Sequence, residues 1–314
     1  MEFPGDVDLV LERLREGLVA RADLVGMYVY GSLVTGDFSP ARSDIDVVVV
    51  LDRESDEAAV GELGKLHAEV ARSGGAAWQL HCLYVAAEHA SDPERLCTYW
   101  FGDRMTQWQM KIMTQAELAS VGVALHGPWP PPGIGPVPVA DIQAAVLAEM
   151  RGYWRRFARK RKRWLDDDSI DHALIVLPRA EAVLVSGDLI TKGEAISRLA
   201  DFGIPAALAQ EIQRRRAGHE VTLSTAQRLR RGYRARRIMQ RGVRRLSRLD
   251  PQERLSSAAN LRFPVLLSRG PAAYVICPAS PGLPGSGNVN GGTCVAALPG
   301  CARMCPVLAS GQEA

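Results

Sequence analysis

The sequence contains no apolar run as long as the roughly 18 residues that a membrane-spanning helix needs, and this argues against an integral membrane protein. Its acidic start, residues 1–6, lacks the basic and apolar regions of a signal peptide. Aromatic residues make up only 6% of the 314 residues, whereas 47% are hydrophobic and 23% are charged. This composition excludes disorder along the whole chain. We therefore expect a cytoplasmic protein of about two domains that makes no membrane contact.

Cysteine is also sparse, and the six cysteines fit no standard metal site. Cys82 and Cys97 stand apart from any Cys-x-x-Cys pattern. The spacing Cys294-x6-Cys301-x3-Cys305 in the C-terminal segment differs from that of known zinc sites. In a cytoplasmic protein the expected state of these residues is the reduced thiol.

The net charge of +3 conceals two parts of opposite sign. Residues 1–150 carry 10 Lys and Arg against 22 Asp and Glu, a net charge of −12. Residues 151–248 carry 24 against 10, a net charge of +14. Opposed fields of this kind often face a ligand that itself carries both signs of charge.

The first part of the chain alternates between helical and strand patterns. Apolar residues recur at helical spacing over 6–23 and 56–72, and the β-prone runs 24–30, 43–51 and 78–85 read as strands. Within the second run, four consecutive valines favour a buried strand over a helix. These elements predict an α+β domain over residues 1–127, built on a small mixed sheet.

The remainder of the chain reads as a linker, a helical domain and a tail. Residues 128–138 are rich in proline and predict a stiff linker. Residues 139–249 show helical periodicity throughout, which predicts an α-helical bundle. Residues 250–314 become rich in glycine and proline without periodicity, so we expect a poorly ordered tail and assign it no function.

One motif carries specific chemistry, namely Gly31-Ser32-x11-Asp44-x-Asp46. A strand that ends in Gly-Ser lets the backbone approach a triphosphate, whose oxygens Ser32 and the nearby Ser43 could bind. Asp44 and Asp46 stand two apart on a strand, so both carboxylates point to one face and repel each other. Mg²⁺ neutralises such a pair while it bridges phosphate oxygens, which predicts an in-line nucleotidyl-transfer site. The alternative is an ordinary pair of acids at a strand edge.

Together these residues resemble the signature of the polymerase-beta-like nucleotidyltransferase superfamily. The narrower resemblance is to the aminoglycoside adenylyltransferases that act on streptomycin and spectinomycin, and it covers residues 5–248, including the segment 187–192. It implies Mg²⁺-dependent transfer of AMP from ATP to a hydroxyl of a small, cationic substrate, with release of pyrophosphate. The residues that carry it read Tyr30-Gly31-Ser32-Leu33-Val34-Thr35-Gly36 and Ser43-Asp44-Ile45-Asp46-Val47.

The chain departs from this family at the third carboxylate, which the family carries on the next strand. Here that strand contains no acid, and Gln79 and His81 are predicted to share one of its faces. Glutamine does not accept a proton at neutral pH, whereas histidine does, so His81 is the predicted replacement base or outer ligand. If His81 instead only hydrogen-bonds a neighbour, the chain is a slow or weakened relative of the family.

The helical domain contains a group of residues that the resemblance places near the substrate. Trp164 and the acids Asp167, Asp168 and Asp171 would hold a cationic acceptor, because carboxylates pair with amino groups and an indole face suits a cation. The alternative is that Asp167 or Asp168 caps a helix that begins near residue 169.

Two basic residues of the same domain are candidates for binding ATP phosphates. Lys192 matches a lysine that the family uses for this purpose, and Arg179 is a second candidate. A solvated surface lysine is the alternative for Lys192.

The arginine runs of the helical domain have several possible roles. Thirteen arginines fall between residues 214 and 248, and others lie between 151 and 163. A solvated amphipathic helix explains most of them, and some could close a cleft against the acidic domain. Such a face could also bind nucleic acid, so action on RNA or on a protein is the rival hypothesis. We expect a monomer whose main partners are ATP and a small substrate.

Overall fold

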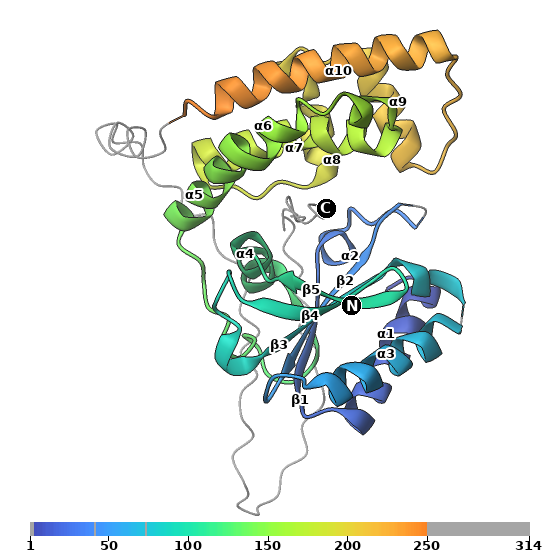
Figure 1. Cartoon of the computed structure of the whole chain (residues 1–314), viewed down its shortest axis with the longest axis vertical. Coiled ribbons are helices and arrows are strands. Elements are labelled where there is room, and N and C mark those ends of the chain that lie inside the picture. The colour runs from blue at the N-terminus through green and yellow to red at the C-terminus, as the bar shows by residue number, and fades with distance from the viewer. Residues whose placement is uncertain (1–2, 41, 73, 250–314) are drawn as a thin grey trace, which may run out of the picture.

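A computed structural model of the chain describes residues 3–40, 42–72 and 74–249 (Figure 1). The predicted tail over 250–314 and its cysteines lie outside these residues. The described part contains a six-stranded mixed sheet in the order β5-β4-β3-β2-β1-β6, in which β2 and β3 are parallel and the other neighbours antiparallel. Its strands are β1 (Leu24–Tyr30), β2 (Ile45–Leu51), β3 (Leu80–Ala86), β4 (Leu96–Phe101), β5 (Arg104–Gln109) and β6 (Val123–His126).

Helices cover both faces of the sheet, and β2 contributes to both cores because its side chains alternate. Val47 and Val49 pack on the face that is covered by α1 (Gly5–Arg21) and α3 (Glu57–Arg72). Val48 and Val50 pack on the opposite face, together with Leu118 of α4 (Ile112–Val121). The run of four valines is therefore a strand buried on both faces, as predicted.

The proline-rich segment 128–138 packs against the sheet. The Tyr28 hydroxyl donates a hydrogen bond of 2.8 Å to the carbonyl oxygen of Pro128, and the Trp129 ring lies 6.2 Å from the Tyr28 ring. Ile134 is buried in the core on the α4 face. A Cβ at Gly133 would lie only 2.3 Å from the carbonyl oxygen of Ala87, so the backbone approaches closely here. The segment is thus fastened to the N-terminal part.

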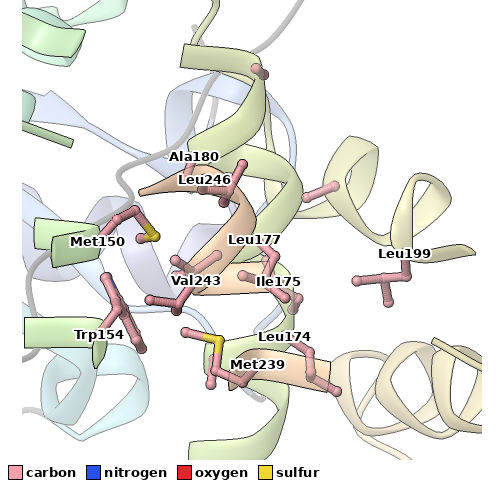
Figure 2. Close-up of a cluster of buried hydrophobic side chains, with 14 of the residues drawn as sticks. Met150, Trp154, Leu174, Ile175, Leu177, Ala180, Leu199, Met239, Val243 and Leu246 are labelled. Atoms are coloured by element: carbon pink, nitrogen blue, oxygen red, sulfur yellow. The ribbon is translucent and has the colours of Figure 1, made fainter. Parts of the chain in front are cut away.

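The helical part follows and is arranged around α7, as Figure 1 shows. In its core, Leu174 and Leu177 of α7 meet Met239 and Val243 of α10, with Trp154 beside them (Figure 2). Helix α4 of the N-terminal part joins this core through Met113 and Ala116. The helices of the helical part are α5 (Val139–Glu149), α6 (Arg155–Phe157), α7 (Asp167–Ser186), α8 (Lys192–Ser197), α9 (Ala206–Arg216) and α10 (Thr225–Leu246). The short helix α2 (Ser32–Thr35) belongs to the N-terminal part and follows β1.

Helix α10 is amphipathic, with its apolar side buried and its arginines largely on the opposite side. Ser224 and Gln227 form the capping box that the sequence predicts at its start. A Cβ at Gly232 would lie 1.9 Å from the carbonyl oxygen of Trp164, so glycine allows α10 to lie directly against that segment. Among the described residues, no helix combines the length and the apolar character needed to cross a membrane.

Most predicted elements are confirmed, but some details of the predictions were wrong. The strand predicted over 78–85 begins at Leu80, because Gly75–Gln79 form a 3-10 turn in which Trp78 is 63% exposed. Gln79 therefore does not share a strand face with His81. The cap of α7 is Asp166, whose carboxylate accepts from the Ser169 backbone, and not Asp167 or Asp168. The hairpin β4–β5, helix α4 and strand β6 were not predicted.

Candidate active site

The motif residues meet at one end of the two central strands. β1 ends at Tyr30, which pairs with Asp46 of β2, so the turn after β1 lies beside the acids. Gly31 has a φ of 73°, a conformation that L side chains rarely adopt, and it turns the chain into α2 with Ser32 at its first position. Ser32 and Ser43 are both buried. The Ser43 hydroxyl accepts a 2.9 Å hydrogen bond from the backbone N–H of Ser39, which folds the loop back toward the acids.

The two carboxylates differ in their surroundings. Asp44 precedes the strand and its side chain is 48% exposed, whereas Asp46 lies within β2. Burial, and then the neighbouring charge of Asp44, raise the pKa of Asp46 to about 7, although Lys192 of α8 acts in the opposite direction. A divalent cation would remove this conflict, and carboxylate oxygens are the donors that Mg²⁺ prefers. Asp44 and Asp46 therefore fit a magnesium site whose other ligands are water or phosphate.

A metal cage built from protein side chains alone does not occur in the described part of the chain. No group of three or more His, Cys, Asp or Glu residues there is arranged to hold a metal ion. Mg²⁺ that assists phosphoryl transfer is typically held by one or two carboxylates together with substrate phosphates. The two-carboxylate arrangement agrees with that kind of site.

His81 lies next to the acid pair, as the spacing predicts. It is the β3 residue opposite Asp46, and its Nε2 is 3.6 Å from Oδ1 of Asp44. The ring packs against Phe101, with 4.9 Å between the ring centroids. Burial lowers the pKa of His81 more than the charge of Asp44 raises it, and Lys192 lowers it further. A neutral imidazole in this position can accept a proton.

Glu117 is a carboxylic acid at the site that the sequence analysis missed. It belongs to α4, which covers the sheet face to which Tyr30 and Val48 point, and it is 1% exposed. Neither carboxyl oxygen has a hydrogen-bond partner among the described residues. Burial raises the pKa of Glu117 well above its ordinary value, opposed by Arg179 and reinforced by Asp46. No motif marks this glutamate, because it becomes part of the site only through the packing of α4 on β1.

The two predicted phosphate-binding residues lie across from the acids, in the helical part. Lys192 is the first residue of α8, whose start is fixed by a capping box between Thr191 and Glu194. Its positive charge lowers the pKa values of both Asp46 and His81, so it interacts electrostatically with these two residues. Arg179 is 1% exposed and donates from Nε to the carbonyl oxygen of Ile190 over 3.0 Å. Arg179 thereby supports the turn that presents Lys192.

The predicted acceptor-binding acids are engaged with basic residues. Arg215 donates two hydrogen bonds, of 2.7 and 2.6 Å, to the carboxylate of Asp171. Asp167 pairs with Arg231, and Asp168 pairs with Arg42.

Trp164 is 2% exposed and lies beneath α10. In this conformation its ring is not available for stacking on a ligand, so a role in acceptor binding remains a proposal.

A clasp between Asp37 and the helical part fastens the loop that carries Ser43. The Asp37 carboxylate accepts from the Gly193 backbone N–H and from Arg216, each over 3.2 Å. The Ser39 hydroxyl donates to the carbonyl oxygen of Arg216. The clasp ties the start of α8, where Lys192 is the first residue, to this loop.

A cavity of about 550 Å³ lies away from these residues. Leu51 and Ala86, the last residues of β2 and β3, contribute to its lining together with Glu54, His89 and Arg95. Asp46 stands near the opposite end of β2, so this cavity does not belong to the candidate active site.

Comparisons with known proteins give a family match and a similar fold. Residues 11–101 match the family model described as a nucleotidyltransferase domain. The fold is similar to that of the spectinomycin adenyltransferase AAD(9) from Enterococcus faecialis, solved with ATP and spectinomycin, with a TM-score of 0.54 and 13% sequence identity. The similarity covers 74% of this chain and 98% of that chain, and at this identity it shows the fold alone. No curated protein sequence matches the chain.

Proposed function

We propose that the protein transfers AMP from ATP to a hydroxyl of a small, cationic, aminoglycoside-like molecule. The match of residues 11–101 to the model of a nucleotidyltransferase domain supports the general reaction. The observation that carries this proposal is the meeting of Ser32, Asp44 and Asp46 at one end of the sheet, with Lys192 opposite. The likeness to a fold that was solved with ATP and spectinomycin supports the choice of donor and acceptor class.

The reaction would be an in-line displacement at the α-phosphorus of ATP. The acceptor oxygen forms the new bond to phosphorus, the bond to the bridging oxygen breaks, and pyrophosphate leaves. A divalent cation held by Asp44 and Asp46 would neutralise charge on the phosphate oxygens. Ser32 and the turn at Gly31 would bind the leaving phosphates, and Lys192 would hold them from the opposite side.

Two groups are placed to take the proton of the acceptor hydroxyl. His81 lies beside Asp44, and its lowered pKa leaves the imidazole neutral and able to accept a proton. Glu117 belongs to α4 and interacts electrostatically with Asp46, but burial raises its pKa, which favours the protonated carboxyl over the carboxylate. We favour His81 as the proton acceptor for that reason. Glu117 would donate a hydrogen bond to the acceptor.

The test is incubation of the full chain with ATP, Mg²⁺ and a panel of aminoglycosides and aminocyclitols, followed by mass spectrometry. We expect one acceptor to gain the mass of a single AMP in the presence of Mg²⁺ but not of EDTA. Asp46→Asn should abolish the product, and Asp52→Asn, which changes an exposed acid, should not. No AMP transfer to any acceptor, combined with no Mg²⁺-dependent binding of ATP, would refute the proposal.

The role of His81 is tested by kinetics of the active enzyme. Removing a general base typically costs about 100-fold or more in kcat, so His81→Ala should show a loss of that size with little change in KM for ATP. Glu117→Gln, which still donates a hydrogen bond, should lose less. The reverse order would assign proton transfer to Glu117 instead.

A further inference from the structure

Helix α10 lies on the side of the helical part that is away from the sheet (Figure 1), and its exposed side carries a row of arginines. Residues at spacings of three and four lie in one row along a helix. Five exposed arginines of α10 have this spacing: Arg230, Arg234, Arg237, Arg241 and Arg244. At 1.5 Å per residue the row is about 21 Å long. The printed sequence places no acid anywhere within α10.

A second group of basic residues flanks this row. Arg236 and Gln240 of α10 both donate hydrogen bonds to the carbonyl oxygen of Ala158, which fastens the segment 155–162 alongside the helix. The exposed basic residues of this segment are Arg155, Arg156, Arg159, Lys160, Arg161 and Lys162. We call these six residues and the five of the α10 row the basic face.

The positive charges of the basic face are not paired with carboxylates of the described residues. Nearby arginines that meet carboxylates are Arg215, Arg231 and Arg245. By contrast, none of the residues of the basic face forms an ion pair with a carboxylate in the part of the chain that the structure describes. Exposed charges of one sign at this density repel each other, so a polyanion that binds them releases counterions and relieves the repulsion.

An aromatic ring stands beside the α10 row. Tyr233 is 61% exposed, and its hydroxyl accepts a 3.3 Å hydrogen bond from Arg237. It precedes Arg236 and Gln240 by three and seven residues, so it lies on the flank of α10 that faces the segment 155–162. An exposed ring between two rows of cations suits an unpaired base whose neighbouring phosphates are held on either side.

The apolar side of α10 argues against a membrane as the partner. An amphipathic helix binds a lipid surface by inserting its apolar face. In α10 that face is occupied, because Ile238, Met239 and Val243 are buried in the core of the helical part. Insertion would therefore require α10 to leave the fold.

We propose that the basic face binds single-stranded RNA, with phosphates on its arginines and an unpaired base stacked on Tyr233. This surface lies apart from the acid pair, so the inference does not depend on the reaction that the active site performs. Arginine suits this role because its planar guanidinium binds phosphate oxygens in pairs and stacks on bases.

The test is fluorescence anisotropy of the full chain with a labelled single-stranded RNA of about 20 nucleotides. With about five phosphates neutralised, log Kd should rise with log [KCl] at a slope of about 3 to 4. Affinity should thus fall about 100-fold between roughly 50 and 200 mM KCl. Absence of binding at the lower salt concentration would overturn the proposal.

Two sets of variants locate the surface. The triple change Arg234→Gln, Arg237→Gln and Arg241→Gln should lower the slope by about 2 and weaken binding about tenfold or more. The matched control removes the same charge from exposed arginines of the N-terminal part, with Arg13→Gln, Arg72→Gln and Arg104→Gln, and should leave the affinity unchanged. Equal weakening by both sets would mean that total charge, and not the basic face, decides binding.

Variants of Tyr233 test whether the ligand of the basic face is single-stranded RNA or another polyanion. Tyr233→Ala should weaken binding about fivefold or more, whereas Tyr233→Phe, which retains the stacking surface, should change it less than about twofold. Heparin and duplex DNA are the comparison ligands. If either binds as tightly as the RNA and its affinity is unchanged by Tyr233→Ala, the assignment to single-stranded RNA is overturned. Unchanged thermal melting and ATP binding of each variant confirm that the fold is intact.

Discussion

The raised pKa of Asp46 predicts that the candidate metal ligand destabilises the metal-free protein. A pKa of about 7 in the folded chain, against 3.8 for a free carboxyl, corresponds to about 4 kcal/mol at pH 8. Solvent reaches part of this side chain and screens the charge, so we expect about half of that value. Asp46→Asn should therefore stabilise the metal-free protein by about 2 kcal/mol, or about 4 to 8 °C in Tm.

The sign of the pH dependence follows from the direction of this shift. A carboxyl whose folded pKa is raised favours folding most below its unfolded pKa, and that contribution is lost as the pH rises from about 4 to about 7. The advantage of Asp46→Asn should accordingly be largest at pH 8 and less than half as large at pH 5. Mg²⁺ should raise the Tm of the parent chain but not that of the variant.

Thermal unfolding in the presence of EDTA, across this pH range, is the assay. Asp52→Asn removes an exposed carboxylate at the other end of β2 and serves as the control, with an expected change below about 0.5 kcal/mol. An Asp46→Asn variant that is no more stable than the parent at pH 8, or that Mg²⁺ stabilises as strongly as the parent, would contradict the reasoning.

Three further predictions concern the fold and the clasp. Gly232→Ala should lower the free energy of unfolding by about 2 kcal/mol or more, because its Cβ would lie 1.9 Å from a backbone oxygen. Gly61→Ala, at an open position of α3, should instead raise it by up to about 1 kcal/mol. Urea denaturation of both variants measures the two effects. Glu117→Gln should raise the Tm at pH 8 but not at pH 4, since its raised pKa makes the ionised form unfavourable in the fold. Asp37→Ala should weaken ATP binding, measured by calorimetry, because it frees Gly193 and the adjacent Lys192 from the clasp. The Tm should shift by only a few degrees. An unchanged Kd for ATP would contradict this prediction.

The sequence predicted the centre of the sheet because its signals there are local. The apolar runs over β1 and β2 fix these strands without any knowledge of the rest, although β2 begins at Ile45 and so leaves Asp44 just before the strand and not on it as predicted. The hairpin β4–β5 carries a weaker signal, since its strands show mixed burial without a clean alternation of apolar and polar residues.

The parts of the site that the sequence could not predict depend on distant segments. Glu117 joins the site because α4 packs on β1, some 90 residues away in the sequence. The acids Asp167 and Asp171 meet Arg231 and Arg215, which no local pattern pairs with them. In each case the partner is set by tertiary packing, and the sequence supplies only the residue type.

The fastening of the segment 128–138 to the sheet determines how the two parts of the molecule are tethered. Since Pro128 and Ile134 are held by the N-terminal part, the free connection to α5 is only the few residues before Val139. A tether this short keeps the helical part at a high effective concentration over the acid pair, even when the clasp opens. Opening of the clasp alone would thus leave the two halves attached, because Met113 and Ala116 of α4 are also buried in the core of the helical part.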